Sequence, residues 1–177
     1  LLNTSLRCCM KIVMVTEWFL PDTGGAETHI YELSSHLTEE NHEVHVISGL
    51  WENQKLPIKE ELNGFHVHRP IKWRWLKTCQ DQMDFITSAA LTMMSILEKV
   101  DVIHAHSTYF SPAAITAAIM LNKPCVLTLH WAWPVFPSSD CRLTCDGCTD
   151  EKCRTCERNK YGDLQYLVAY KRALTRM

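Results

Sequence analysis

A short apolar segment followed by a glycine pair constrains the fold of this chain more than any other feature. Residues 12–15 read Ile-Val-Met-Val, which suits a buried parallel strand, and Pro21 and Asp22 then interrupt the regular structure. Gly24 and Gly25 follow, and because they lack side chains the backbone there can approach a ligand closely. The next apolar residues recur at helical spacing: Ala26, Ile30, Leu33 and Leu37. The stretch predicts a strand, a loop and a helix whose N-terminus lies beside the glycines.

The N-terminus of this helix is a candidate anion site. Its first backbone N–H groups have no partner within the helix, and the positive end of the helix dipole lies there, so a phosphate would be stabilised. Two glycines before a helix are also ordinary turn residues, which leaves both interpretations open for this stretch taken alone.

Strand-like and helix-like segments alternate along the rest of the chain. Strands are expected at 43–48, 65–69 and 100–106, and a buried strand at 125–130. Helices are expected at 82–99 and 111–121, and a loop at 51–63. This order predicts an α/β fold, with a Rossmann-like parallel sheet, helices on both faces and ligands at the carboxyl ends of the strands. The helix at 82–99 should turn one stripe inward: Met83, Ile86, Ala90, Met94 and Leu97, widened by Leu91 and Met93.

Size and composition narrow the class of protein. The 177 residues, 46% of them apolar, suffice for one well-buried domain and are too few for two Rossmann-like halves. The formal charge of −2 gives no argument for a nucleic-acid partner. No apolar run approaches the ~18 residues that a membrane-spanning helix needs. We expect residues 1–9 to be an extension or the remnant of a leader, and residues 10–177 to form the domain.

Three segments of the chain resemble one enzyme family. The string Gly-Gly-Ala-Glu-Thr-His-Ile-Tyr-Glu-Leu at 24–33, followed by Asn-His-Glu-Val-His-Val-Ile at 41–47, is similar to the opening of retaining glycosyltransferases with the GT-B fold. Asp-Val-Ile-His-Ala-His at 101–106 and Thr-Leu-His at 128–130 are similar to later parts of that fold. This group includes the enzymes that put N-acetylglucosamine or mannose on phosphatidylinositol.

The resemblance implies a function for a larger protein. The chain would be the N-terminal, acceptor-side half of a GT-B fold, inactive by itself because the donor-binding C-terminal domain is absent from these residues. The whole enzyme would transfer a sugar from a nucleotide-sugar to an acceptor, with retention at the anomeric carbon, and a lipid-linked acceptor is one option. A non-catalytic Rossmann-like binding module with a structural zinc site is the alternative.

The resemblance and the positions in the predicted fold suggest roles for several residues. His130 would face the transferred sugar and support catalysis, and Gly24 and Gly25 would admit a phosphate to the helix N-terminus. Asp22 and Glu17 lie near the same loop and could orient the acceptor hydroxyl, although solvated loop carboxylates would look the same.

Two further histidines follow from the strand at 100–106. His104 and His106 share one face of that strand near its carboxyl end. We expect His106 on the wall of the cleft and His104 as a packed neighbour. Hydrogen-bonded structural histidines remain the alternative for His104, His106 and His130.

A cysteine-rich insertion at 141–156 predicts a metal site. Cys145 and Cys148 form one Cys-x2-Cys pair, and Cys153 and Cys156 form a second, so that four thiolates could bind one zinc ion, with Cys141 as an alternative ligand. Such a site would be structural, because no position is left open for water or substrate. An iron–sulfur cluster, disulfides and free thiols remain alternatives.

The segment 71–77 mixes cationic and bulky apolar side chains. Lys72, Arg74 and Lys77 could lie against anionic lipid, and a strand with two buried tryptophans would produce the same alternation. We expect a cytoplasmic protein. Peripheral contact with a membrane surface is an alternative that this segment leaves open.

Overall fold

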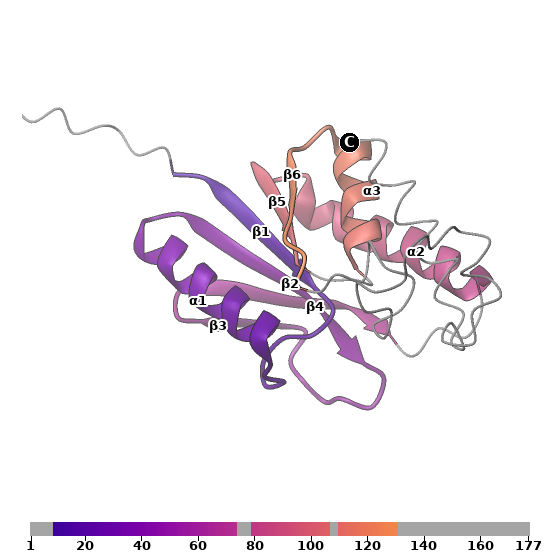
Figure 1. The fold of residues 1–177 in the computed structure, drawn as a ribbon, viewed down its shortest axis with the longest axis horizontal. Coiled ribbons are helices and arrows are strands. Elements are labelled where there is room, and N and C mark those ends of the chain that lie inside the picture. The colour runs from indigo at the N-terminus through magenta and orange to yellow at the C-terminus, as the bar shows by residue number, and fades with distance from the viewer. Residues whose placement is uncertain (1–8, 74–78, 107–109, 131–177) are drawn as a thin grey trace, which may run out of the picture.

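The computed structural model describes residues 9–73, 79–106 and 110–130 (Figure 1). The elements in chain order are β1 (Lys11–Thr16), α1 (Gly25–Glu39), β2 (Glu43–Trp51), β3 (Lys59–Leu62), β4 (Phe65–Trp73), α2 (Cys79–Leu97), β5 (Val102–Ala105), α3 (Ser111–Leu121) and β6 (Cys125–Leu127). The predicted alternation of strands and helices is confirmed in this part of the chain.

The strands form one sheet in the order β3-β4-β2-β1-β5-β6. All neighbouring pairs are parallel except β3 with β4. The first strand of the sequence lies in the interior, between β2 and β5, and carries the apolar run that predicted it. The carboxyl ends of the five parallel strands therefore meet at one edge of the sheet.

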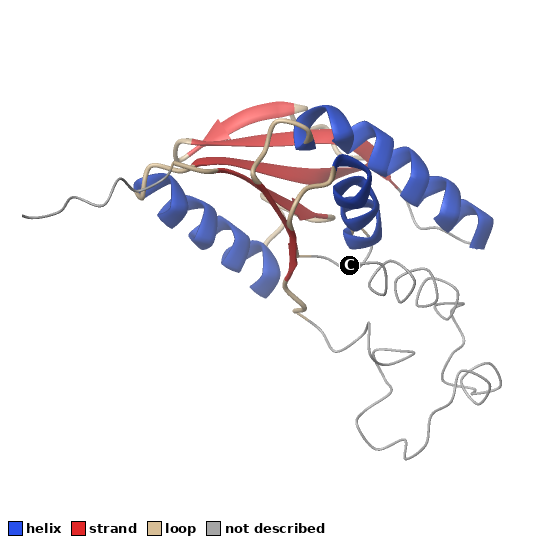
Figure 2. Cartoon of the chain, turned by 90° about the horizontal axis from the view of Figure 1, so that it is seen from above, coloured by secondary structure: helices blue, strands red, loops and turns tan. Residues whose placement is uncertain are grey.

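Alternate residues of β1 divide the core between the two faces of the sheet. Ile12 and Met14 pack with Ile30 of α1, whereas Val13 and Val15 pack with residues of α2 and α3, such as Met93. In Figures 1 and 2, α2 and α3 lie together and away from α1. Helices thus cover both faces, as predicted, because the strand periodicity of two sends neighbouring side chains to opposite sides.

The predicted loop at 51–63 contains a strand, which is a correction. β3 pairs antiparallel with β4 through the two-residue turn Asn63-Gly64, whose φ angles are 45° and 83°. Asn-Gly with positive φ at both positions is the preferred sequence of a tight hairpin turn. The strand is polar and lies at the sheet edge, so it lacks the apolar alternation on which the prediction relied.

Two packing predictions are also wrong. Leu91 was expected in the inward stripe of α2, but it is 58% exposed, and Phe85 and Ala89 fill the buried face instead. The segment 125–130 was expected to be a buried strand, but β6 ends at Leu127. Val126 and Leu129 are 49% and 46% exposed, because β6 is the last strand of the described sheet and has a neighbour on one side only.

Candidate functional site

The loop between β1 and α1 lies at the carboxyl end of the sheet and leads into the glycine pair. Gly24 and Gly25 are both exposed, and α1 begins at Gly25. The φ angle of Gly24 is −153°, an extended conformation open to any residue, so backbone strain does not explain the glycine. A Cβ on Gly24 would lie 2.5 Å from Oε2 of Glu27, whereas one on Gly25 would meet nothing within 4 Å. The absence of a side chain at Gly24 thus leaves room for the Glu27 carboxylate, an acidic group that suits the first turn of a helix.

A buried arginine on β4 holds this loop. Arg69 is 2% exposed, and its Nη2 donates a hydrogen bond to the carbonyl oxygen of Leu20 at 2.8 Å. Its Nη1 donates to the carbonyl oxygen of Pro57 at 3.2 Å, and the guanidinium forms an ion pair with Glu60 at 2.6 Å. A single side chain thus joins β4, β3 and the segment before the glycines.

Gln54 forms a second link to the loop. Its Nε2 donates to Oδ2 of Asp22 at 2.8 Å, while its Oε1 accepts the backbone N–H of Trp51 at 3.0 Å. Asp22 is therefore held by the connection that follows β2. The roles of Gln54 and Arg69 were not predicted from the sequence, because a polar residue in a loop and an arginine in a strand give no local signal of such distant partners.

Glu17, the other predicted carboxylate, is only 6% exposed at the end of β1. Its carbonyl oxygen accepts the N–H of Gly49 at 3.1 Å, which extends the contact between β1 and β2 past the last paired residues. This burial distinguishes Glu17 from the solvated loop carboxylate that sequence analysis kept as an alternative.

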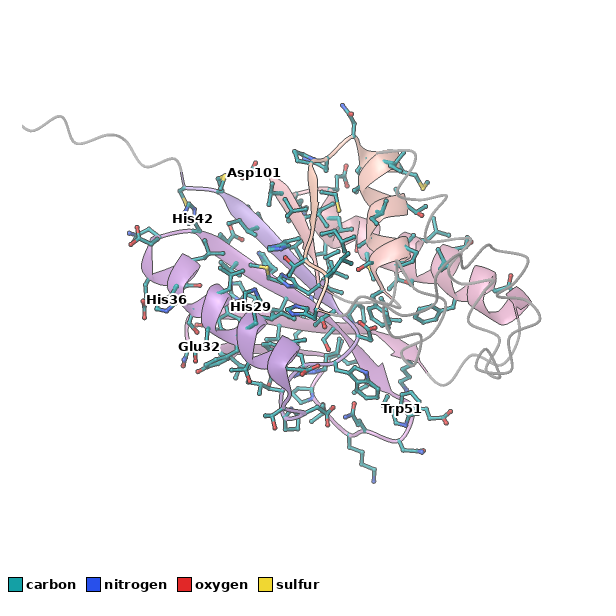
Figure 3. The ribbon with its side chains drawn as sticks, viewed as in Figure 1. His29, Glu32, His36, His42, Trp51 and Asp101 are labelled. Atoms are coloured by element: carbon teal, nitrogen blue, oxygen red, sulfur yellow. The ribbon has the colours of Figure 1, made fainter. Side chains whose placement is uncertain are left out.

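Four histidines from three parts of the chain gather beside α1. His104 and His106 come from β5 and its end, His130 follows β6, and His29, labelled in Figure 3, lies on α1 next to the sheet. The ring centroid of His29 is 5.3 Å from that of His130 and 5.6 Å from that of His106. Nδ1 of His106 lies 3.3 Å from Nε2 of His130, and Nε2 of His104 lies 2.8 Å from Oγ1 of Thr128.

The histidines differ in burial and are shifted toward the neutral form. His106 is 2% exposed, and burial, followed by the neighbouring histidines 104, 130 and 29, lowers its pKa to about 2. Burial also lowers the pKa of His104 and that of His130, in both cases with a further contribution from His29. Glu27 acts in the opposite direction on His130. At neutral pH the uncharged form of these three rings is therefore favoured.

The structure brings some of the predicted site residues together and keeps others apart. The structure brings His106 and His130 into contact, but His106 is enclosed rather than exposed on a surface. His29 lies within the family-like string at 24–33, but the string alone predicted no role for it. Its distance of four residues from Gly25 was the available signal, because it puts His29 one turn into a helix that starts at the site. The Asp22 carboxylate accepts its described hydrogen bond from Gln54.

A second group of histidines lies on the opposite face of the sheet, near the amino ends of β2 and β4. Nδ1 of His45 is 2.8 Å from Nε2 of His68, and Nε2 of His45 is 2.9 Å from Oε1 of Glu43, which also forms an ion pair with Lys11. Burial, followed by the charges of His45 and Lys59, lowers the pKa of His68 to about 4.

Several predicted features lie outside the described residues. These are the cysteine ligands Cys141, Cys145, Cys148, Cys153 and Cys156 and the basic residues Arg74 and Lys77. Within the described ranges, no group of histidine, cysteine or acidic side chains could hold a metal ion. The helices described in this structure also include none with the length and apolar character needed to cross a membrane.

Comparison with known proteins identifies the family. The model of a family described as Glycosyltransferase Family 4 matches residues 23–176. One subunit of human phosphatidylinositol N-acetylglucosaminyltransferase is 32% identical over 123 residues, which cover 68% of this chain and 25% of that protein. The GPI3 subunit of the same transferase from Saccharomyces cerevisiae is 25% identical over 122 residues, covering 68% and 27%. The chain thus spans about a quarter of the length of these curated relatives.

A solved structure supports the fold. The catalytic domain of starch synthase IV from Arabidopsis thaliana matches with a TM-score of 0.54 and 14% identity, over 70% of this chain and 34% of that one. The expected Rossmann-like domain of a GT-B glycosyltransferase is confirmed as a fold, with one antiparallel edge strand added to the parallel sheet.

Proposed function

Since the chain belongs to glycosyltransferase family 4, we propose that residues 10–177 form the N-terminal, acceptor-side domain of an enzyme that transfers a sugar from a nucleotide-sugar. The observation that carries this proposal is the convergence of His29, His106 and His130 at the carboxyl edge of the sheet, beside the N-terminus of α1. Open α/β sheets bind their ligands at this edge. A second domain, outside these residues, would hold most of the nucleotide.

The names of the relatives suggest the two substrates. N-acetylglucosamine would be the transferred sugar and phosphatidylinositol the acceptor. A lipid acceptor requires access to a bilayer, so the domain would lie on a membrane surface. We propose that this is the cytoplasmic surface. The exposed Lys72 at the end of β4, with Arg74 and Lys77 after it, would contact anionic headgroups.

Two parts of the site would contact different groups of the substrates. The N-terminus of α1 would bind a phosphate of the substrate. The Glu27 carboxylate, which lies against Gly24 in this structure, would have to change its conformation to make room. His130 would contact the sugar. Because the pKa values of His106 and His130 are lowered, these rings add no positive charge near an oxocarbenium-like transition state. Transfer would proceed with retention, and Asp22 and Glu17 would help to place the acceptor hydroxyl.

The test is a graft into the yeast relative. Residues 10–130 of this chain replace the matching segment of the GPI3 subunit, and transfer from UDP-N-acetylglucosamine to phosphatidylinositol is measured in membranes. We expect the graft to be active and its His130→Ala variant to lose at least about a hundredfold in rate, the usual scale for an essential site group. A graft that is folded and abundant but inactive would contradict the proposal and favour a non-catalytic binding module.

A further inference from the structure

We infer that His106 is a positioning residue that holds His130 in one tautomer, with its hydrogen on Nε2 and a lone pair on Nδ1 for a substrate hydroxyl. The source of that hydroxyl rests on the proposed function, whereas the tautomer follows from the contacts and the burial of the two rings. The chain of contacts runs from Met14 on β1 through His106 to His130.

Met14 determines which nitrogen of His106 carries hydrogen. Nε2 of His106 lies 3.4 Å from Sδ of Met14, and both side chains are buried, with 2% and 0% exposure. A thioether has no hydrogen to donate and is a weak acceptor. We therefore assign the hydrogen of His106 to Nε2, where its N–H points at the sulfur, because the other tautomer would leave a buried lone pair facing the lone pairs of the thioether.

The neutral state of His106 then determines the hydrogen of His130. A neutral imidazole has one N–H, so Nδ1 of His106 has only a lone pair. His106 is enclosed beside three other histidines, with no acidic partner among its described contacts, and burial lowers its pKa to about 2. The 3.3 Å contact between Nδ1 of His106 and Nε2 of His130 is therefore a hydrogen bond that His130 donates.

This arrangement leaves Nδ1 as the nitrogen of His130 that no described residue contacts by a hydrogen bond. Among the described residues Nδ1 has no hydrogen-bond partner, and the ring is partly exposed beside the exposed His29. The charged or titratable groups around His130 among the described residues are His29 and Glu27 from α1, His104 from β5 and His106 just after it. A neutral ring with a lone pair on Nδ1 accepts a hydrogen, so it matches a hydroxyl and not a phosphate oxygen, which needs a donor.

The first test reads the tautomer in the chain itself. Long-range proton–nitrogen NMR spectra of the 15N-labelled protein at pH 7.5 should show His130 as the Nε2–H form. His106→Phe removes the acceptor, so the preference should be lost, whereas His106→Gln offers a carbonyl oxygen and should retain it. His36→Gln, a change at a ring 71% exposed on α1, is the control and should alter nothing. An Nδ1–H tautomer for His130 in the unaltered chain would overturn the inference.

The second test uses the active graft and separates positioning from structure. We expect His106→Phe to lower kcat/KM by about three- to thirtyfold, which is the scale expected when one hydrogen bond and the ring orientation that it fixes are lost. His106→Gln should restore most of the lost activity. A rise in KM for the sugar nucleotide would identify a sugar hydroxyl, and a rise for the lipid an acceptor hydroxyl. Equal losses in the two variants at unchanged stability would contradict a positioning role. An inactive unaltered graft would count against the proposed function, and the tautomer would still decide this inference.

Discussion

Arg69 on β4 donates a hydrogen bond to the carbonyl oxygen of Leu20 at 2.8 Å, across 49 residues of sequence. The guanidinium is buried, and its contacts reach the segment before the glycine pair, Pro57 shortly before β3 and the Glu60 carboxylate on β3. The conformation of the loop between β1 and α1 thus depends on a cation in a distant strand. Removal of this cation should lower the free energy of unfolding and reduce the order of the loop.

Arg69→Met is expected to lower the free energy of unfolding by about 3 kcal/mol, because it removes a buried ion pair and leaves Glu60 and two carbonyl groups without their partner. Lys55→Met, at an exposed position in the same connection, should cost no more than roughly 0.5 kcal/mol. Urea denaturation of both variants measures the difference. Similar values for the two would show that the Arg69 contacts contribute little.

Gln54→Leu should destabilise the loop more than the whole domain. The substitution removes the hydrogen bond to Asp22 and costs about 1 kcal/mol, with faster amide hydrogen exchange concentrated at residues 20–25. A double-mutant cycle with Asp22→Ala should give a coupling energy of roughly 1 kcal/mol. Additive effects of the two substitutions would mean that this hydrogen bond does not hold the loop in solution.

Stability should fall as the pH is lowered from 7 to 5. The pKa values of His106 and His68 lie at about 2 and about 4 in the folded chain, below the ordinary histidine value of 6.5, so the unfolded chain binds more protons in this range. For His106 alone the linked loss between pH 7 and pH 5 is roughly 2 kcal/mol. Urea denaturation at each pH measures it, and His106→Phe should flatten the dependence. An equally steep pH dependence in that variant would assign the effect to other groups.

His29→Ala should raise the pKa of His130, because the charge of His29 is one cause of its lowered value. NMR titration of the chain measures the shift, and His36→Ala, at an exposed position of the same helix, should leave the pKa of His130 unchanged. In the active graft the same substitution should reduce kcat/KM about tenfold or more without a loss of stability above roughly 0.5 kcal/mol. An unchanged rate would remove His29 from the site.

Cys148→Ser tests the predicted metal site. The purified chain should contain about one zinc ion, and the variant should lose most of it, since each ligand of a four-thiolate site contributes to binding. Elemental analysis measures the content, with Cys9→Ser as the control outside the motif. Retained stoichiometric metal in Cys148→Ser would exclude this ligand set, and iron with visible absorption would favour an iron–sulfur cluster.

Sequence patterns predicted the features that depend on neighbouring residues. The apolar run at 12–15, the break at Pro21 and the helical spacing from Ala26 each reflect the preferences of a few adjacent residues, and the structure confirms that strand, loop and helix. The Asn63-Gly64 turn is also a local pattern of adjacent residues, and it could have predicted a hairpin and therefore β3. The family-like strings added His106 and His130, which the fold brings together.

The sequence by itself therefore determined the order of the elements apart from β3, the fold class and the family of this protein. Only the tertiary structure decided that His29 meets His130 across 101 residues, that Arg69 holds Leu20, and that His106 is enclosed against Met14. These contacts depend on which strands are neighbours in the sheet and on the angle at which α1 crosses them. Local propensities carry no information about either, because both result from the packing of the whole domain.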